Sequence, residues 1–129
     1  MTYIVDTSAY SSFFRGETKL KQYFEQDITI CIPLIVVGEL RGGFAAGSKY
    51  DYNEHYLQRF LDRPNVRVLG LSDKTTILYA SIYATLRQSG KPIGSNDMWI
   101  AALALEHDCL LVTLDSDFKR VPDLLIAKI

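Results

Sequence analysis

Short runs of β-forming apolar residues alternate with longer helical segments along this chain, and this alternation limits the folds that it can adopt. The runs rich in Val, Ile and Leu cover residues 3–5, 28–32, 66–69, 109–113 and 124–129. Between them, apolar spacing predicts helices over 8–14, 34–46, 50–63, 73–89 and 97–107, with a further amphipathic stretch at 17–25. Strands this short and this apolar are typical of a parallel sheet covered by helices on both faces. We therefore predict a three-layer α/β/α fold with a central, mainly parallel sheet.

Residues that favour helix ends mark several of the predicted boundaries. Asp6 or Thr7 is placed to cap the first helix, and Asn96 to cap the helix at 97–107. Ser72 or Asp73 opens the long fourth helix. One face of that fourth helix is predicted to carry Ile77, Ala80 and Ala84.

The length of 129 residues predicts one domain over 1–129, because neither a linker nor an internal repeat divides it. No apolar run approaches the roughly 20 residues of a membrane span, and the N-terminus lacks the pattern of a signal peptide. Cys31 and Cys109 each lie in an apolar run, which favours buried, reduced thiols over a disulfide framework. These features lead us to expect a cytoplasmic protein.

Four acidic residues occupy positions where the predicted fold would bring them together. Asp6 directly follows the first strand, and Asp115 follows the strand at 109–113. Asp97 lies in the first turn of a helix, where the helix dipole favours negative charge. Glu39 interrupts the apolar run 34–40, where a charge is costly unless something compensates it. Because function gathers beyond the carboxyl ends of parallel strands, we expect these side chains to share one edge of the sheet.

Several carboxylates in one pocket need compensating cations to stay ionised. A ligand set made only of oxygen atoms suits Mg²⁺ or Mn²⁺ rather than zinc. Such ions activate water and stabilise displacement at phosphorus. The acids therefore suggest hydrolysis of a phosphodiester. The net charge of −1 permits a nucleic-acid substrate without demanding one.

Each acid also has a purely structural explanation, which the sequence leaves open. Capping of the following helix is by itself enough to explain Asp6. A favourable interaction with the helix dipole is by itself enough to explain Asp97. Asp115 and Asp117 can form a solvated turn, and Glu39 can pair with Arg41 or another basic residue. The functional interpretation rests on the joint placement of the acids.

Four segments resemble the PIN domain family and, within it, the VapC-type toxins of bacterial and archaeal toxin–antitoxin pairs. They are 4–8 (IVDTS), 37–43 (VGELRGG), 95–102 (SNDMWIAA) and 111–118 (LVTLDSDF), in the order found in the family. The resemblance implies a PIN-like fold and an endoribonuclease dependent on Mg²⁺ or Mn²⁺. It implies that Asp6, Glu39, Asp97 and Asp115 are the catalytic and metal-binding residues.

The same resemblance implies further roles and partners. Asp117 is then an accessory acid near the metal, and Thr113 or Thr7 hydrogen-bonds the metal-binding carboxylates. Family members are commonly homodimers, and a small VapB-like antitoxin wraps them and covers the site. Four basic residues near the motifs are candidates for RNA phosphate contacts: Arg41, Lys91, Lys119 and Arg120.

The antitoxin would need an apolar surface and a cation for the acidic pocket, most simply an arginine. The helices at 34–46 and 50–63, with the stripe Tyr52, Tyr56 and Phe60, are the candidate groove, although such a stripe also fits core packing.

Other classes of protein explain less of the sequence. A haloacid-dehalogenase-type phosphatase needs an acid where Ser8 stands. A Toprim nuclease leaves Asp6 and Asp97 unexplained, and a receiver-like signalling module needs a lysine at the end of a later strand. A non-catalytic PIN-like module for RNA binding or protein interaction remains the alternative function.

Overall fold

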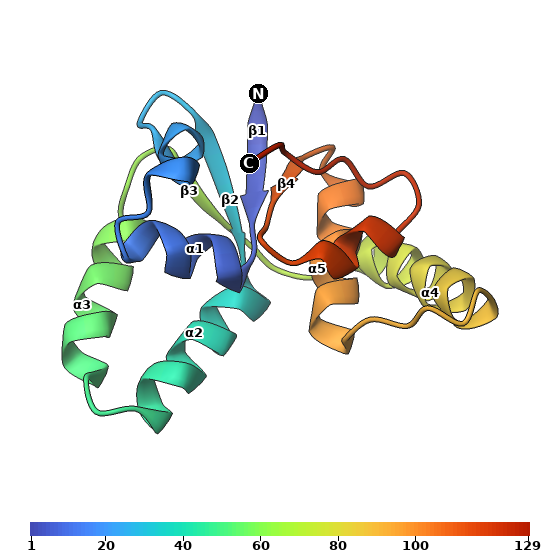
Figure 1. Cartoon of the computed structure of the whole chain (residues 1–129), viewed down its shortest axis with the longest axis horizontal. Helices are drawn as coiled ribbons and strands as arrows, with labels where there is room; N and C mark the ends of the chain where they lie inside the picture. The colour runs from blue at the N-terminus through green and yellow to red at the C-terminus, as the bar shows by residue number, and fades with distance from the viewer.

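The computed structural model describes all 129 residues and has a central sheet between two layers of helices (Figure 1). The sheet has four parallel strands in the order β3-β2-β1-β4. Helices α1, α2 and α3 cover one face, and α4 and α5 cover the other (Figure 1). The elements are β1 (Thr2–Val5), α1 (Thr7–Phe14), the 3-10 helix η1 (Thr18–Phe24), β2 (Thr29–Pro33), α2 (Leu34–Ala46), α3 (Tyr50–Leu61), β3 (Val66–Leu69), α4 (Asp73–Gln88), α5 (Ser95–Glu106), β4 (Leu110–Val112) and the 3-10 helix η2 (Ser116–Arg120). The predicted three-layer α/β/α fold is confirmed.

Strand β1 lies inside the sheet and pairs with β2 on one side and β4 on the other. Its residues Ile4 and Val5 have no exposed surface, and neither do Leu111 and Val112 beside them in β4. Because all four strands run the same way, the chain leaves β1 and β4 at the same edge of the sheet. That edge is where Asp6 and Thr113 emerge.

Polar residues define where two of the helices begin. The Asp6 carboxylate accepts a hydrogen bond from the backbone N–H of Ala9, which caps α1. Ser72 and Thr75 form a reciprocal capping box at the start of α4. Gly16 and Gly90 then follow α1 and α4 with φ of 81° and 70°, a left-handed conformation in which glycine carries no steric cost. None of the helices is long and apolar enough to span a membrane.

The predicted strand at 124–129 is wrong. This segment makes only an isolated parallel bridge between Ile126 and Leu111, with two hydrogen bonds to the Leu111 backbone. Strand β4 is three residues long, so its outer edge offers little for a longer strand to pair with. The sheet therefore has four strands, and the C-terminal segment lies beside it.

The expected cap of α5 by Asn96 is also wrong, because the helix begins at Ser95 after Gly94. Asn96 is thus already inside the helix, and its side chain points to Glu39 instead. The amphipathic stretch at 17–25 is largely the 3-10 helix η1.

The face of α4 that carries Ile77 is exposed, with 64% of the Ile77 surface accessible. Ala80 and Ala84 on the same face are exposed as well. The helix instead packs through Ile82 and Leu86, which are buried. An apolar face of α4 is therefore left without a partner in the single chain.

Candidate active site

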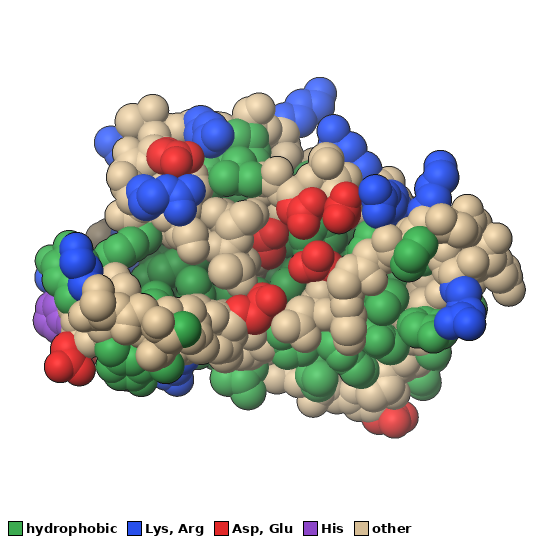
Figure 2. Space-filling model, turned by 60° about the horizontal axis from the view of Figure 1, so that its bottom comes forward, with side chains coloured by type: hydrophobic (Ala, Val, Ile, Leu, Met, Phe, Trp, Pro, Cys, Tyr) green, Lys and Arg blue, Asp and Glu red, His purple; other side chains and the backbone are tan.

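Four acidic residues from four segments meet at the carboxyl edge of the sheet. Asp6 follows β1, Glu39 lies in α2, Asp97 lies in the first turn of α5, and Asp115 follows β4. With Thr7, Ser8, Ser11 and Ile100 they line a pocket of about 280 Å³. Figure 2 shows carboxylate side chains gathered in a hollow near the middle of this face. The structure thus brings together all four acids that the sequence singled out.

Asp6 is the most buried of the four, with 4% of its surface exposed. Its Oδ1 accepts hydrogen bonds from the Ala9 backbone N–H at 2.9 Å and the Ser8 hydroxyl at 2.7 Å, and its Oδ2 accepts one from Thr113. Burial raises the pKa of Asp6, while these hydrogen bonds act to lower it and the nearby charge of Asp115 raises it further. The side chain is both a helix cap and a rigid wall of the pocket.

Glu39 is held in place from two other segments. Its Oε1 accepts a hydrogen bond of 2.7 Å from the Thr7 hydroxyl, and its Oε2 accepts one of 3.2 Å from the Asn96 amide. These contacts compensate a charge that interrupts the otherwise apolar run 34–40. They also link the middle of α2 to the first turns of α1 and α5.

Thr113 organises the loop that carries Asp115. Its hydroxyl donates to Asp6 and accepts a hydrogen bond of 3.0 Å from the Asp115 backbone N–H. Asp115 then caps η2 by accepting from the backbone N–H of Asp117 at 2.9 Å. Asp117 lies at the rim, where its carboxylate pairs with Arg120 at 3.3 Å.

Asp97 is the acid whose charge the protein satisfies least. Desolvation, followed by the negative charges of Asp115, Asp6, Glu39 and Asp117, raises its pKa to about 6. Its position at a helix N-terminus acts in the opposite direction, because the helix dipole stabilises a carboxylate there. None of the side-chain hydrogen bonds in the structure involves its carboxylate, so neither a donor nor a basic residue of the chain offsets its charge.

The residues of the pocket fit a hydrated divalent ion better than a dehydrated one. No group of three Asp, Glu, His or Cys side chains is arranged to hold a metal ion by direct contact. Mg²⁺, however, commonly keeps several waters and takes only one or two carboxylates directly. The pocket has room for an ion with waters, since each water occupies roughly 30 Å³. The side chains of the pocket offer only oxygen donors, and the raised pKa values of Asp6 and Asp97 show that these carboxylates lack a compensating positive charge. Both features fit a hydrated Mg²⁺ or Mn²⁺ ion.

The four basic residues proposed to contact RNA have different environments. Arg41 forms two hydrogen bonds to Glu54, at 3.0 and 2.9 Å, which link α2 to α3. Arg120 pairs with Asp117 and donates to the Pro92 carbonyl. Lys91 and Lys119 are exposed and make no ion pair. Arg41 is therefore committed to a contact inside the chain, whereas the two lysines are free.

The aromatic stripe on α3 divides into two parts. Phe60 is 5% exposed and packs among Tyr10, Phe13 and Phe24, so it belongs to the core. Tyr52 and Tyr56 remain exposed and contact the ring of Phe14 from α1. The prediction that all three form one surface groove is wrong for Phe60.

Two residues that position the acids were not singled out from the sequence. Ser8 donates to Asp6 and accepts a hydrogen bond of 3.0 Å from the Leu114 backbone N–H, which joins α1 to the loop after β4. Asn96 donates to Glu39. Ser8 stands two residues after Asp6 in a typical capping pattern, which was a usable signal. Asn96 gave the wrong signal, because an Asn before a helix is most simply interpreted as a cap.

Comparison with known proteins agrees with the predicted fold and family. A family model described as the PIN domain matches residues 3–124. The chain is 36% identical over 99 residues to ribonuclease VapC2 of Rickettsia felis, covering 76% of this chain and 72% of that protein. It is 28% identical to ribonuclease VapC1 of Haemophilus influenzae, covering 96% and 95%. A chain in the crystal structure of VapBC2 from Rickettsia felis bound to a promoter DNA fragment superposes with a TM-score of 0.88, 30% identity and 98% of both chains covered.

Proposed function

This chain belongs to the PIN domain family, and we propose that it is a VapC-type ribonuclease, the toxin of a toxin–antitoxin pair. Relatives named as VapC ribonucleases support the activity, and the similarity to a chain from a VapBC structure supports the pairing. We further propose that the enzyme is an endoribonuclease, which hydrolyses internal phosphodiester bonds of RNA and depends on Mg²⁺ or Mn²⁺. Cytoplasmic RNA is the expected substrate.

The single observation that carries this proposal is the group of acids around Asp97. A bound Mg²⁺ or Mn²⁺ would activate a water and stabilise the charge that develops at phosphorus. Asp97 and Asp115 accept fewer hydrogen bonds from the chain than Asp6 and Glu39 do, so they would hold the ion directly or through water, with Asp6 and Glu39 around it. Because the pKa of Asp97 is about 6, this group is largely ionised at pH 7. Thr113 and Ser8 hold the Asp6 carboxylate in one orientation. The site therefore does not need to reorganise during the reaction.

The test uses protein stripped of divalent ions with a chelator and a labelled single-stranded RNA. We expect no cleavage until Mg²⁺ or Mn²⁺ is added, and none with Asp97→Asn, Asp115→Asn or Asp6→Asn at any metal concentration. Arg59→Ala, a change on α3 away from the pocket lining, is the control and should cleave normally. Cleavage that persists in the chelator, or in the acid variants, would contradict the proposal. Binding of RNA without cleavage would favour the non-catalytic alternative.

The antitoxin is proposed to dock on exposed aromatic residues and to place a cation in the acidic pocket. Phe14, Tyr52 and Tyr56 form an exposed aromatic cluster between α1 and α3. On that side of the molecule, Figure 2 shows hydrophobic side chains lining a hollow next to the carboxylates. An apolar face of an amphipathic segment would fit there. An arginine from the same segment would reach the carboxylates and form paired hydrogen bonds with one of them.

Replacement of Tyr52 and Tyr56 by Ala tests that docking surface. We expect antitoxin affinity to fall on the order of tenfold or more, since buried tyrosines are common hot spots, while the free toxin keeps its activity. Tyr83→Ala, an exposed tyrosine on α4, is the matched control. Unchanged affinity in the double variant would place the antitoxin elsewhere.

A homodimer is proposed through the exposed face of α4 that carries Ile77, Ala80 and Ala84. Small residues flanking an exposed isoleucine allow two helices to approach closely. Ile77→Asp should shift the sedimentation coefficient from dimer to monomer. An unchanged coefficient would rule out this face as the dimer contact.

A further inference from the structure

A second groove adjoins the acidic pocket and carries the opposite charge. It has a volume of about 660 Å³, within the range of roughly 300–1,000 Å³ found for ligand sites. Its basic lining residues are Lys19 from η1, Lys119 from η2 and Lys128 from the C-terminal segment. The apolar part of the lining comes from Leu114, Ile126, Ala127 and Ile129. Figure 2 shows hydrophobic side chains flanked by Lys and Arg side chains above the carboxylates.

The groove and the pocket are continuous. Asp115 lines both of them, and Thr113, which donates to Asp6, also lines the groove. The far wall is fixed because the Tyr23 hydroxyl of η1 donates to the Lys128 carbonyl. A ligand that reaches the carboxylates can therefore extend into the groove without leaving the surface.

The lysines of the groove are available for an external anion. Lys119 and Lys128 form no ion pair, and Lys19 has only a 3.8 Å contact to the exposed Glu17. The other side of the acidic pocket differs, since the hollow there is lined by Glu39, Asp97 and the segment from Gly94 to Asn96, with no basic residue. Basic residues therefore line the groove but not the hollow beside Glu39 and Asp97.

We propose that this groove binds the RNA strand on one side of the scissile phosphate. Lys19, Lys119 and Lys128 contact successive backbone phosphates, and the apolar floor contacts the ribose and base faces. A carboxylate pocket repels a polyanion, so the attraction that brings the substrate there must come from neighbouring cations. This inference rests on the proposed ribonuclease function and adds Lys19 and Lys128, which no sequence motif marks.

The test measures binding of a fluorescein-labelled single-stranded RNA of mixed sequence to the Asp97→Asn chain, which is not expected to cleave it. In that background we add Lys19→Ala and Lys128→Ala together. We expect the Kd at low salt to rise on the order of tenfold. The slope of log Kd against log salt should fall by about 0.7 for each phosphate that the variant no longer neutralises. In the otherwise unmodified chain, the same pair of changes should raise KM and leave kcat nearly constant.

Lys21→Ala is the matched control, because Lys21 lies on the same 3-10 helix and does not line the groove. It should leave the Kd and KM unchanged and the salt slope at its parental value. The proposal is overturned if the paired variant, folded by circular dichroism, matches Lys21→Ala in both affinity and salt slope. If the wild-type chain binds RNA through these lysines but does not cleave it with Mg²⁺ or Mn²⁺ present, the groove stands and the ribonuclease proposal fails.

Discussion

The two ends of α5 each carry a carboxylate, and the two carboxylates have opposite properties. Asp97 lies in the first turn, where the helix dipole favours negative charge, yet its pKa is raised to about 6. Glu106 lies in the last turn, where the dipole disfavours negative charge, yet its pKa is lowered. The immediate neighbours of each group therefore outweigh the helix dipole.

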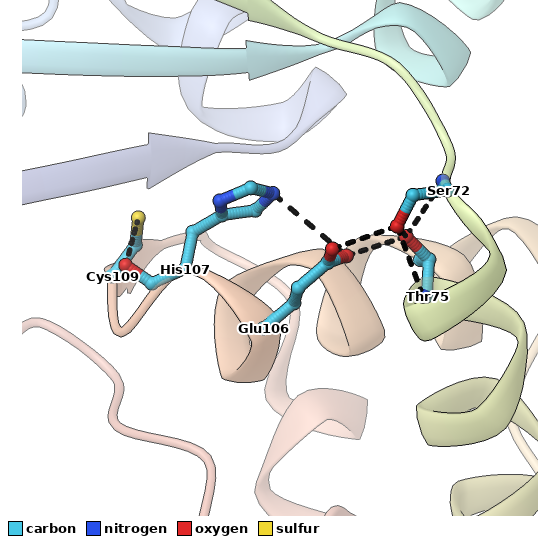
Figure 3. Close-up of polar contacts among 5 residues, drawn as sticks. All are labelled: Ser72, Thr75, Glu106, His107 and Cys109. Carbon is cyan, nitrogen blue, oxygen red and sulfur yellow. Dashed lines mark hydrogen bonds and ion pairs between the residues drawn. The ribbon is translucent and has the colours of Figure 1, made fainter.

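Hydrogen-bond partners account for the behaviour of Glu106. Desolvation acts to raise its pKa, but hydrogen bonds from Thr75 and Ser72, helped by the charges of His107 and Lys74, more than offset it. Figure 3 shows both hydroxyls directed at the Glu106 carboxylate across the contact between α4 and α5. The Glu106 carboxylate thus joins the start of α4 to the end of α5, and His107 lies 3.8 Å from it.

The contrast separates a structural carboxylate, Glu106, from a candidate metal-binding one, Asp97. Ser72 donates to Glu106 and not to His107, so the Ser72–Glu106–His107 group does not form a nucleophile–base pair. At Asp97 the neighbours are four other acids and no donor to the side chain. A group whose charge is left unsatisfied is a better candidate for binding a cation than one whose charge is fully compensated.

The largest expected effect is on catalysis. Asp97→Asn should abolish detectable cleavage of RNA, a fall in kcat/KM of at least on the order of 10³-fold, which is the upper end of the loss typical of removing one group that stabilises charge in a transition state. Glu106→Gln should change kcat/KM less than about threefold per folded molecule. Steady-state cleavage of one labelled RNA measures both. Comparable losses in the two variants would remove the distinction between the two ends of α5.

A smaller effect is expected on stability at the Glu106 end. Thr75 has no exposed surface and its hydroxyl donates to Glu106, so Thr75→Val should lower the free energy of unfolding by about 1–3 kcal/mol. Thr76→Val is the control, since Thr76 is exposed and bonds only the backbone carbonyl of Asp73. Urea unfolding measures both variants. Equal stability of Thr75→Val and wild type would show that this contact does not hold α4 to α5.

The smallest expected effect is on the pH dependence of stability, with opposite signs at the two ends. The raised pKa of Asp97 means that the folded metal-free protein binds more protons than the unfolded chain, so this contribution to stability falls as the pH rises from about 4 to about 6. The change should be about 1–2 kcal/mol, less than the full shift implies because the pocket is open to solvent. It should disappear in Asp97→Asn.

The lowered pKa of Glu106 gives stability that is present above the unfolded pKa and is lost as the pH falls through the folded value. Glu106→Gln should therefore remove stability near neutral pH and remove less at acidic pH. Urea unfolding without divalent ions, repeated between pH 3.5 and pH 7, measures both slopes. The difference in unfolding free energy between wild type and Asp97→Asn should change with pH in the opposite direction to the difference between wild type and Glu106→Gln. Changes in the same direction would contradict the assigned pKa shifts.

The sequence was sufficient for the fold and for the grouping of the acids, for one physical reason. Apolar runs such as 109–113 are long enough to mark buried parallel strands, and parallel strands deliver their following residues to one edge. That rule placed Asp6 and Asp115 together, and apolar flanks identified Glu39 as unusual. The catalytic roles of these residues stay predictions.

The features that sequence could not supply depend on contacts between distant segments. Leu124 to Ile129 has a strand-like composition, but whether it pairs depends on the length of β4. Asn96 matches a cap in sequence, and only the packing of α2 beside α5 makes it a partner of Glu39. Likewise, Lys19 and Lys128 become neighbours only because the C-terminal segment lies against η1.

Calorimetric measurement of Mn²⁺ binding at pH 7.5 tests the central claim most directly. It shows whether the acids at the carboxyl edge of the sheet hold a cation. The account predicts saturable binding to the wild-type chain, at least about tenfold weaker in Asp97→Asn and unchanged in Glu106→Gln. Absence of binding to the wild-type chain, or equal affinity in wild type and Asp97→Asn, would contradict it.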